Sequence, residues 1–428
     1  MKCMAVVSVA MLVVVAGSAS AQVAVRAKTL YTMAGGPITD GVVVVRDGKI
    51  AAVGPAISTP VPEGFRVIEA AAATPGLIDA RCTVGVSGVL NQVQDQDQLE
   101  RSGPIQPELR AIDAYNPQDP LVEYLRSYGI TTVQTGHAPG QVVSGQLAIV
   151  KTAGNTVEEA VVVAESAIAV TLSPMAQRGG GPGTRAKMIA MIRDQFLKAQ
   201  AYQKKLEEAE RGAGNGEAAK ADDAAAEKKD AKKKEPPARD LRLEALVRVL
   251  EGKTPLVVTA NRSQDIANVL RFAEEFDIRV ILDSASEAYL IVDQIKAANG
   301  GKGYDVLVHP TMARAVGEME NKTFENAAKL REAGLRVAIQ GGFESYVPKA
   351  RVVLLEAGVA AANGLGLEGA LATITIDAAK ILGVESRVGS LEVGKDADIA
   401  LFSGDPFEYT TTCTGVIING KVTDERGR

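Results

Sequence analysis

Short apolar segments bounded by polar turns stand at both ends of the chain. They cover residues 23–28, 42–45, 50–53, 399–402 and 415–420. The pair Asp47-Gly48 lies between two of them, and Asp-Gly between apolar strands is typical of a tight β-hairpin. We therefore predict a small β domain to which both chain ends contribute, over residues 22–75 and 385–428.

Between these ends, apolar runs that predict strands alternate with amphipathic stretches that predict helices. The predicted strands are 76–80, 128–133, 146–151, 255–259, 279–283, 305–308 and 335–339. The predicted helices are 263–275, 323–333 and 367–382. This alternation favours a parallel sheet, and the strands account for all but one of an eight-stranded barrel. We predict an α/β fold, a TIM-like (β/α)8 barrel over residues 76–384.

The segment 178–240 interrupts the alternation. A glycine-rich loop opens it, a helix is predicted at 184–205, and from residue 204 onward large apolar side chains are few while basic and acidic residues balance. Such a composition buries too little apolar surface to order tightly. We predict a flexible, charged, partly helical insertion. Binding of an anionic partner by 228–234 is a weaker interpretation, because acidic residues interleave with the lysines.

The first residues have the parts of an export signal. Lys2 supplies positive charge, residues 4–17 form an apolar run, and small residues follow at 19–21. The run is too short to span a bilayer. We expect residues 1–21 to be a signal peptide and the mature protein to be periplasmic or secreted. Its thiols would then be Cys82 and Cys413, for which the default is a buried free thiol.

Composition narrows the classes of function. The chain of 428 residues is 46% hydrophobic, which allows a large core, and it has 47 basic and 52 acidic residues for a net charge of -5. Aromatic residues make up 4% and there is no Trp. Neither a basic groove nor a stacking platform is indicated, so nucleic-acid binding is excluded.

Three motifs share a pattern with a known superfamily. They are DGVVVVRDGKIAAVG at 40–54, TPGLIDA at 74–80, and the pair TIDAAKILG and GSLEVGKDADIALF at 375–383 and 389–402. As a set they resemble the amidohydrolase superfamily, imidazolonepropionase-like group, over essentially the whole mature chain. The resemblance implies a (β/α)8 barrel with a small β-sandwich built from both termini. It also implies hydrolysis of C–N bonds, often in cyclic amides or peptides, assisted by zinc or another divalent metal.

The resemblance further implies histidine ligands at the strand ends, and other residues stand there in this chain. The superfamily pattern uses about four imidazoles and an aspartate, in line with zinc chemistry, whereas this chain has 2 His. The former metal positions are Arg81, Thr83, Thr259, Asn261, Ser284 and Gly342. A guanidinium at position 81 also places a positive charge where a dication would lie. We therefore predict that the metal-binding residues are replaced, with no metal, no cofactor and no catalytic residue of the superfamily type.

Four further side chains are candidates for local roles. Lys151 ends a predicted strand and is interpreted as a pocket-lining polar plug or an ion pair. His309 and His137 each stand alone in a loop, where a structural hydrogen bond is the common role. Cys82 alternates away from the Arg81 face, so a buried thiol is favoured over a nucleophile. We also expect Arg81 to neutralise a strand-end carboxylate, with the candidates Asp79, Asp283 and Glu287.

Taken together, the sequence predicts an exported amidohydrolase-like protein with a non-catalytic binding or partner role. One version pairs with an active relative or with a second copy of the chain. Another binds a small molecule in a pocket lined by Arg81, Thr83, Lys151, Thr259, Asn261, Ser284, Gly342 and His309. The alternative is a hydrolase of C–N bonds that uses a divergent site.

Overall fold

The computed structural model describes residues 22–90, 92–177, 181–218, 236–344, 347–348 and 352–425. The predicted signal peptide at 1–21 and the lysine-rich stretch 228–234 lie outside these residues, so both stay predictions. Within the described ranges, no helix combines the length and the apolar character needed to cross a membrane.

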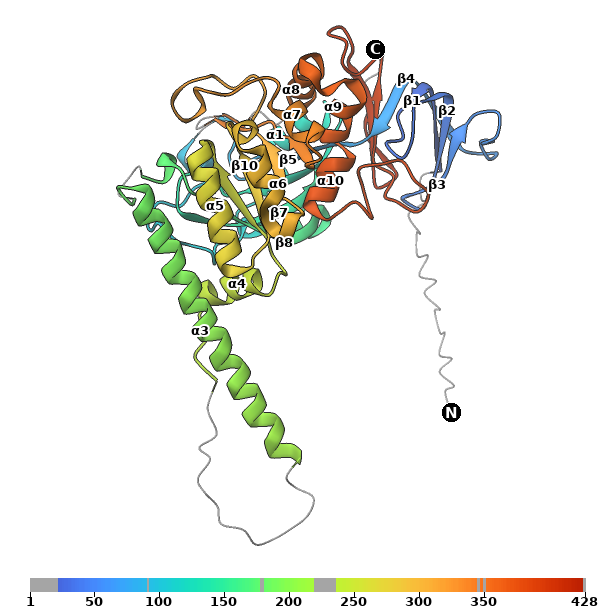
Figure 1. Cartoon of the computed structure of the whole chain (residues 1–428). Coiled ribbons are helices and arrows are strands. Elements are labelled where there is room, and N and C mark those ends of the chain that lie inside the picture. The colour runs from blue at the N-terminus through green and yellow to red at the C-terminus, as the bar shows by residue number, and fades with distance from the viewer. Residues whose placement is uncertain are drawn as a thin grey trace, which may run out of the picture.

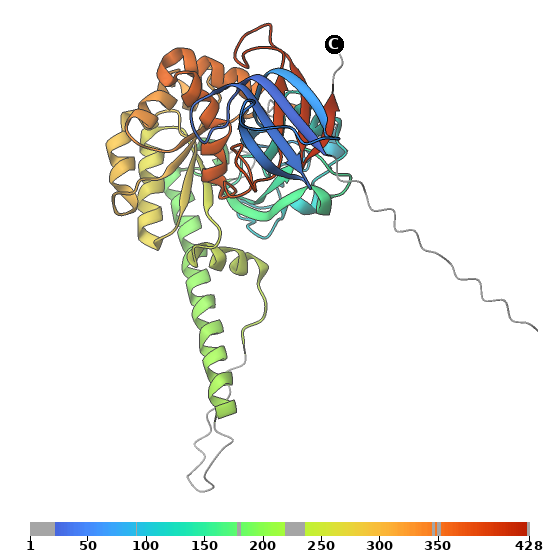
Figure 2. The same ribbon diagram turned by 90° about the vertical axis from the view of Figure 1, so that its right-hand side faces the viewer.

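Both chain ends contribute to one seven-stranded sheet. Its order is β17-β16-β15-β4-β1-β2-β3, and Figure 2 shows the blue and red strands lying together beside the barrel. The antiparallel pairing of β15 with β4 joins the two ends, as predicted. Asp47 and Gly48 have φ of 51° and 78° and form the predicted hairpin between β2 and β3. The strands are β1 (Val23–Leu30), β2 (Ile38–Arg46), β3 (Lys49–Pro55), β4 (Arg66–Pro75), β15 (Ile399–Phe402), β16 (Cys413–Ile418) and β17 (Lys421–Glu425).

The larger region is an eight-stranded, nearly closed barrel, which confirms the predicted fold class. The strand order is β12-β11-β10-β9-β8-β7-β6-β5. The strand that the pattern did not locate is β8. The strands of the barrel are β5 (Leu77–Cys82), β6 (Ile130–Gly136), β7 (Val143–Lys151), β8 (Val161–Thr171), β9 (Leu256–Ala260), β10 (Val280–Ser284), β11 (Asp305–Val308) and β12 (Val337–Ile339). Inward-facing residues such as Ile78, Leu147, Val257 and Leu307 form the barrel core.

One strand of the barrel runs against the others. β7 pairs antiparallel with both β6 and β8, whereas the neighbouring pairs from β8 to β12 and from β5 to β6 are parallel. The connections before and after β7, 137–142 and 152–160, are too short for a crossover that would return a parallel strand. The carboxyl end of β7 therefore lies at the opposite end of the barrel from those of the other strands.

Helices cover the outside of the barrel (Figure 1). The predicted helix 367–382 is broken into two, because the carbonyl of Ile374 turns away to accept a hydrogen bond from the backbone N–H of Ile78 at 2.8 Å. The helices are α1 (Pro120–Arg126), α2 (Val157–Ala160), α3 (Arg185–Ala218), α4 (Leu241–Leu250), α5 (Ser263–Phe276), α6 (Val292–Gly301), α7 (Asn326–Glu332), α8 (Val353–Ala360), α9 (Leu367–Thr373) and α10 (Ile376–Leu382).

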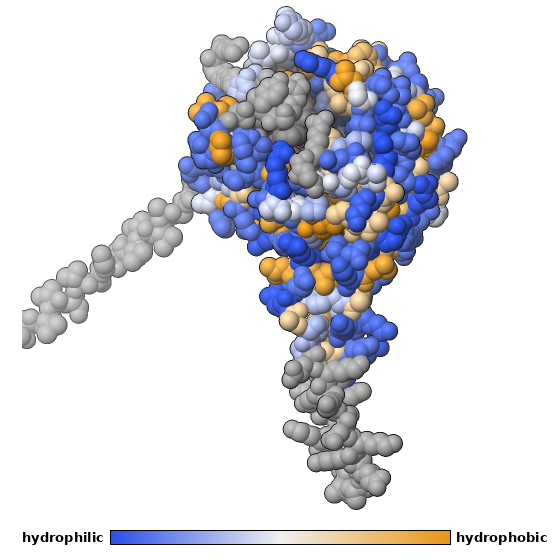
Figure 3. Space-filling model, turned by 90° about the vertical axis from the view of Figure 1, so that its left-hand side faces the viewer, coloured by the Kyte–Doolittle hydropathy of each residue, from blue (hydrophilic) through white to orange (hydrophobic). Residues whose placement is uncertain are grey.

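The helix predicted inside the insertion is longer than expected. α3 is 34 residues long and projects away from the barrel in Figure 1. Its later part is rich in Glu, Lys and Ala, which are good helix formers. Figure 3 shows a largely hydrophilic face, with hydrophobic side chains gathered where this projection leaves the barrel.

Candidate functional site

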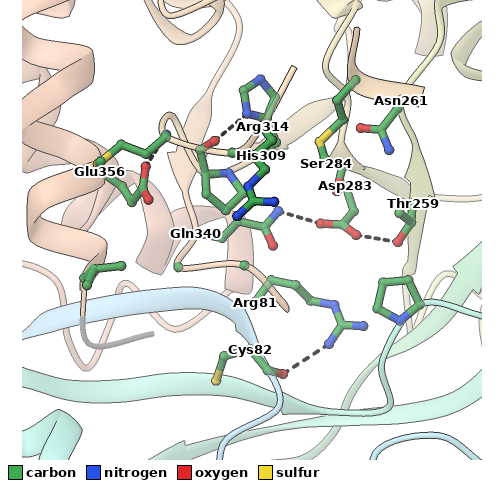
Figure 4. Close-up of a pocket in the computed structure, with 18 of the residues that line it drawn as sticks. Arg81, Cys82, Thr259, Asn261, Asp283, Ser284, His309, Arg314, Gln340 and Glu356 are labelled. Carbon is green, nitrogen blue, oxygen red and sulfur yellow. Dashed lines mark hydrogen bonds between the residues drawn. The ribbon is translucent and has the colours of Figure 1, made fainter. Parts of the chain in front are cut away.

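A cavity of about 560 Å³ opens at the carboxyl ends of the parallel barrel strands. This is the end of a (β/α)8 barrel at which active and binding sites are built. Figure 4 shows side chains from β5, β9, β10 and the segments after β11 and β12 facing the same space. Of the residues predicted to line a pocket, the cavity brings together Arg81, Thr83, Thr259, Asn261, Ser284, His309 and Gly342.

Lys151 is not part of this cavity, which corrects its predicted place in the pocket lining. It ends β7, and because β7 runs antiparallel, Lys151 lies at the other end of the barrel, beside the small domain. Its Nζ is 3.4 Å from Asp396 and also pairs closely with Asp398. The interpretation of Lys151 as an ion pair therefore agrees with the structure, whereas a place at the barrel mouth does not.

Arg81 is held in the cavity floor by backbone carbonyls. Its side chain is 4% exposed. Nη1 donates to the carbonyl of Cys82 at 3.3 Å, and Nη2 donates to the carbonyl of His137. Within the described chain its guanidinium forms no ion pair within 4.0 Å, so the expected neutralisation by direct contact is wrong. Burial lowers the pKa of Arg81, and the charge of Asp283 opposes this from a longer distance.

Asp79 instead closes the barrel between its first and last strands. One carboxyl oxygen accepts the backbone N–H of Arg81 at 3.1 Å, and the other accepts that of Gly341, after β12, at 3.0 Å. The side chain is fully buried. Burial raises the pKa of Asp79 to about 7, although both hydrogen bonds favour the charged form.

Asp283 joins three strands at the cavity wall. Its Oδ1 accepts from Gln340 Nε2 at 2.7 Å, and its Oδ2 accepts from the hydroxyl of Thr259. Both oxygens of this buried carboxylate are therefore occupied by neutral donors. The sequence suggested Asp283 only as a partner of Arg81 and did not suggest Gln340 as a lining residue. Their positions at the ends of β10 and β12 were the available signal.

The two histidines have different places. His309 lines the cavity, and its Nδ1 lies 2.7 Å from the carbonyl of Pro310. The Nδ1 therefore carries the hydrogen, which leaves a lone pair on Nε2, an atom with no partner among the described residues. Burial lowers the pKa of His309 to about 4. His137 lies outside the cavity lining, and burial followed by the charge of Arg81 lowers its pKa to about 4.

The cavity donors differ from those that hold catalytic zinc. Zinc sites use Cys, His and carboxylate ligands, three or more to each ion. Across the described part of the chain, no group of three or more His, Cys, Asp and Glu residues could hold a metal ion. Among the described lining residues, the cavity offers one imidazole and two carboxylates. Asp283 accepts one hydrogen bond at each oxygen, and Glu356 accepts the backbone N–H of Met312 at 2.6 Å. The residues present do not fit the metal that the superfamily resemblance implies.

Comparisons with known proteins agree on one family. The model of the Amidohydrolase family matches residues 109–424. A solved amidohydrolase from Thermotoga maritima MSB8 has a TM-score of 0.83 and 28% identity, over 95% of this chain and 100% of that chain. Phenylurea hydrolase B has a TM-score of 0.54 and 16% identity, over 94% of this chain and 97% of that chain, and supports the fold alone.

A curated relative is also similar in sequence. Amidohydrolase tasK of Hapsidospora irregularis is 25% identical over 369 residues, which is 81% of this chain. The match covers 36% of that protein, so this chain spans only about a third of the length of this relative.

Proposed function

The chain belongs to the amidohydrolase family, and we propose that it binds a small molecule in the barrel cavity without metal-dependent hydrolysis. The observation that carries the proposal is Arg81. The superfamily resemblance implies a metal-binding histidine at this position, and here a buried guanidinium lies against the carbonyls of Cys82 and His137.

Electrostatics argues against a dication in this place. Like charges repel strongly where solvent screening is weak, and Arg81 is 4% exposed. The guanidinium stays protonated in proteins, so it does not become a neutral ligand. Moving it aside would leave two buried carbonyls without their donors, which is itself unfavourable. The floor of the cavity is therefore suited to an anion rather than to a metal ion.

Two candidate bases of the cavity, His309 and Asp283, are poorly suited to hydrolysis without metal. A general base is most effective when its pKa lies near the working pH. Burial lowers the pKa of His309 to about 4, and Asp283 already accepts hydrogen bonds at both oxygens. The competing proposal, a hydrolase of C–N bonds with a divergent site, draws support from the names of the relatives. The side chains of this cavity favour binding.

The size and lining of the cavity support a ligand site. Pockets for small molecules usually have about 300–1,000 Å³ and mostly apolar walls with a few polar groups. The cavity here has about 560 Å³ and contains such a mixture.

Elemental analysis tests the proposal. The full chain would be produced in medium containing zinc and manganese, purified without chelator, and analysed by mass spectrometry for bound metals. We expect no stoichiometric metal. His309→Gln is the matched variant, because His309 is the imidazole of the cavity: a stoichiometric ion that is present in the parent and lost in this variant would lie in the cavity and would overturn the proposal.

A further inference from the structure

We propose that the ligand of this cavity is a carboxylate with an apolar tail, bound with its carboxylate toward Arg81. The inference rests on the proposed function and names the chemical class of the ligand. Three features of the cavity carry it: guanidinium and amide donors, carboxylates that already accept hydrogen bonds from the protein, and an apolar wall.

The cavity floor contains guanidinium and amide hydrogen-bond donors. A guanidinium has five N–H donors. Arg81 donates once from Nη1 and once from Nη2 to backbone carbonyls, which leaves a second hydrogen on each of these two nitrogens. Asn261 adds another donor. Its Oδ1 accepts from Ser286 Oγ at 2.7 Å, so the amide N–H₂ is what the side chain can offer to a ligand.

The cavity is also lined by two carboxylates, Asp283 and Glu356, which accept hydrogen bonds from the protein. Glu356 Oε2 accepts the backbone N–H of Met312 at 2.6 Å. The carboxylate of Asp283 accepts from Gln340 and Thr259, one bond at each oxygen. A second guanidinium, that of Arg314, also lines the cavity and forms no ion pair within the described residues. A flat carboxylate matches the fork of a guanidinium, with two parallel N–H donors facing two oxygens. The polar end of the cavity therefore suits an anion.

Apolar side chains form another part of the lining. It includes Met175, Met312, Val316, Met319, Val352 and Leu355. Met312, Val316 and Leu355 are exposed in the structure, so an apolar tail would remove their surface from water. Methionine side chains adapt their shape to different tails. Each methylene that becomes buried should tighten binding by about fourfold.

Calorimetric titration of the full chain with octanoate tests the inference. We expect octanoate to bind in the cavity and 1-octanol, which has the same chain length and no charge, to bind at least about tenfold more weakly. Arg81→Gln should weaken octanoate by at least about tenfold, because it removes the charge that the carboxylate faces. The matched control is Arg239→Gln, since Arg239 pairs with Glu244 on α4 outside the cavity. Its affinity for octanoate should equal that of the parent.

A second variant guards against a folding defect in Arg81→Gln. Asn261→Asp changes the volume little and places a negative charge beside the ligand carboxylate, so octanoate should again bind at least about tenfold more weakly. Circular dichroism and the urea midpoint of both variants would show that they fold.

Three outcomes would overturn the inference. They are the absence of octanoate binding, equal binding of 1-octanol, and unchanged affinity in the folded Arg81→Gln and Asn261→Asp variants. Metal analysis of the same samples separates this inference from the proposed function. Absence of both octanoate binding and stoichiometric metal would overturn the ligand class alone, whereas a stoichiometric cavity metal would overturn the proposed function.

Discussion

Among the described residues, each end of the barrel buries one cation, and the two cations form different hydrogen bonds and ion pairs. Lys151, 2% exposed, pairs with two carboxylates at the end next to the small domain. Arg81, 4% exposed, donates to backbone carbonyls at the cavity end and keeps an unpartnered Nε within the described chain. The Lys151 end pairs its cation with carboxylates of the protein, whereas the Arg81 end leaves a second hydrogen on each Nη nitrogen for a ligand.

The ion pairs around Lys151 also join the barrel to the small domain. Asp396 accepts from Lys49 at 2.6 Å and from Arg387 at 2.8 Å, and Asp398 accepts the backbone N–H of Asn419 at 2.9 Å. Lys151 thus ties a barrel strand to the segment before β15 and, through Asp398, to the turn between β16 and β17. Breaking this network should affect stability more than any change at the cavity.

The largest expected effect follows from Lys151→Met. Removing one partner of a buried ion pair leaves the other charge buried and uncompensated, which costs about 3–5 kcal/mol. Urea denaturation would measure the change in unfolding free energy. The control is Lys49→Met, because Lys49 is half exposed and contacts the same Asp396; its loss should be about 0–1 kcal/mol. Equal losses of unfolding free energy in Lys151→Met and Lys49→Met would contradict the claim that the buried Lys151 stabilises the protein more than the half-exposed Lys49.

A smaller effect is expected for Arg81→Met. This change takes the donors from two buried carbonyls, a loss of about 1–3 kcal/mol for each, and it also removes the unfavourable burial of a charge, which offsets part of that loss. The same urea measurement should therefore show a smaller loss than for Lys151→Met. A loss as large as that of Lys151→Met would mean that Arg81 has a structural role equal to that of Lys151.

The third effect concerns the pH dependence of the unfolding free energy. Burial lowers the pKa of His309 to about 4, whereas an unfolded histidine has a pKa near 6.5. The unfolded chain takes up this proton first, so the contribution of His309 is fully present above about pH 6.5. It is lost as the pH falls toward 4, by about 1.4 kcal/mol per pH unit. His309→Gln should flatten the dependence of the urea midpoint on pH over this window.

Asp79 is the control for this prediction, because its pKa is shifted in the opposite direction to that of His309. Burial raises the pKa of Asp79 to about 7, above the value near 3.9 of an unfolded aspartate. Its contribution is greatest below that unfolded value and is lost as the pH rises toward 7. Asp79→Asn should therefore steepen the loss of stability on acidification, in contrast to His309→Gln. If both variants changed the pH dependence of stability in the same direction, the opposite pKa shifts of Asp79 and His309 would be contradicted.

The sequence predicted the local features of the fold better than its long-range contacts. The Asp47-Gly48 hairpin and the strand predicted at 76–80 depend on neighbouring residues, and both agree with the structure. The sequence did not predict the reversal of β7, because an apolar run does not indicate whether its strand is parallel or antiparallel to its neighbours. That reversal places Lys151 beside Asp398, a residue 247 positions away.

At the site, the sequence predicted the strand-end residues that meet in the cavity but not their hydrogen bonds. Arg81 was expected to meet a carboxylate, and it meets the carbonyl of His137 instead, a contact set by the path of the backbone after β6. Gln340 was missed because an amide at a strand end carries no distinctive signal. Export, pairing with an active relative and the absence of metal stay predictions.

The most direct test of the account is the affinity of the full chain for octanoate, measured by calorimetry with EDTA and again with zinc. If Arg81 binds the carboxylate without metal, the two dissociation constants should be equal. Binding that requires zinc, or that zinc tightens by tenfold or more, equivalent to about 1.4 kcal/mol, would contradict the central claim.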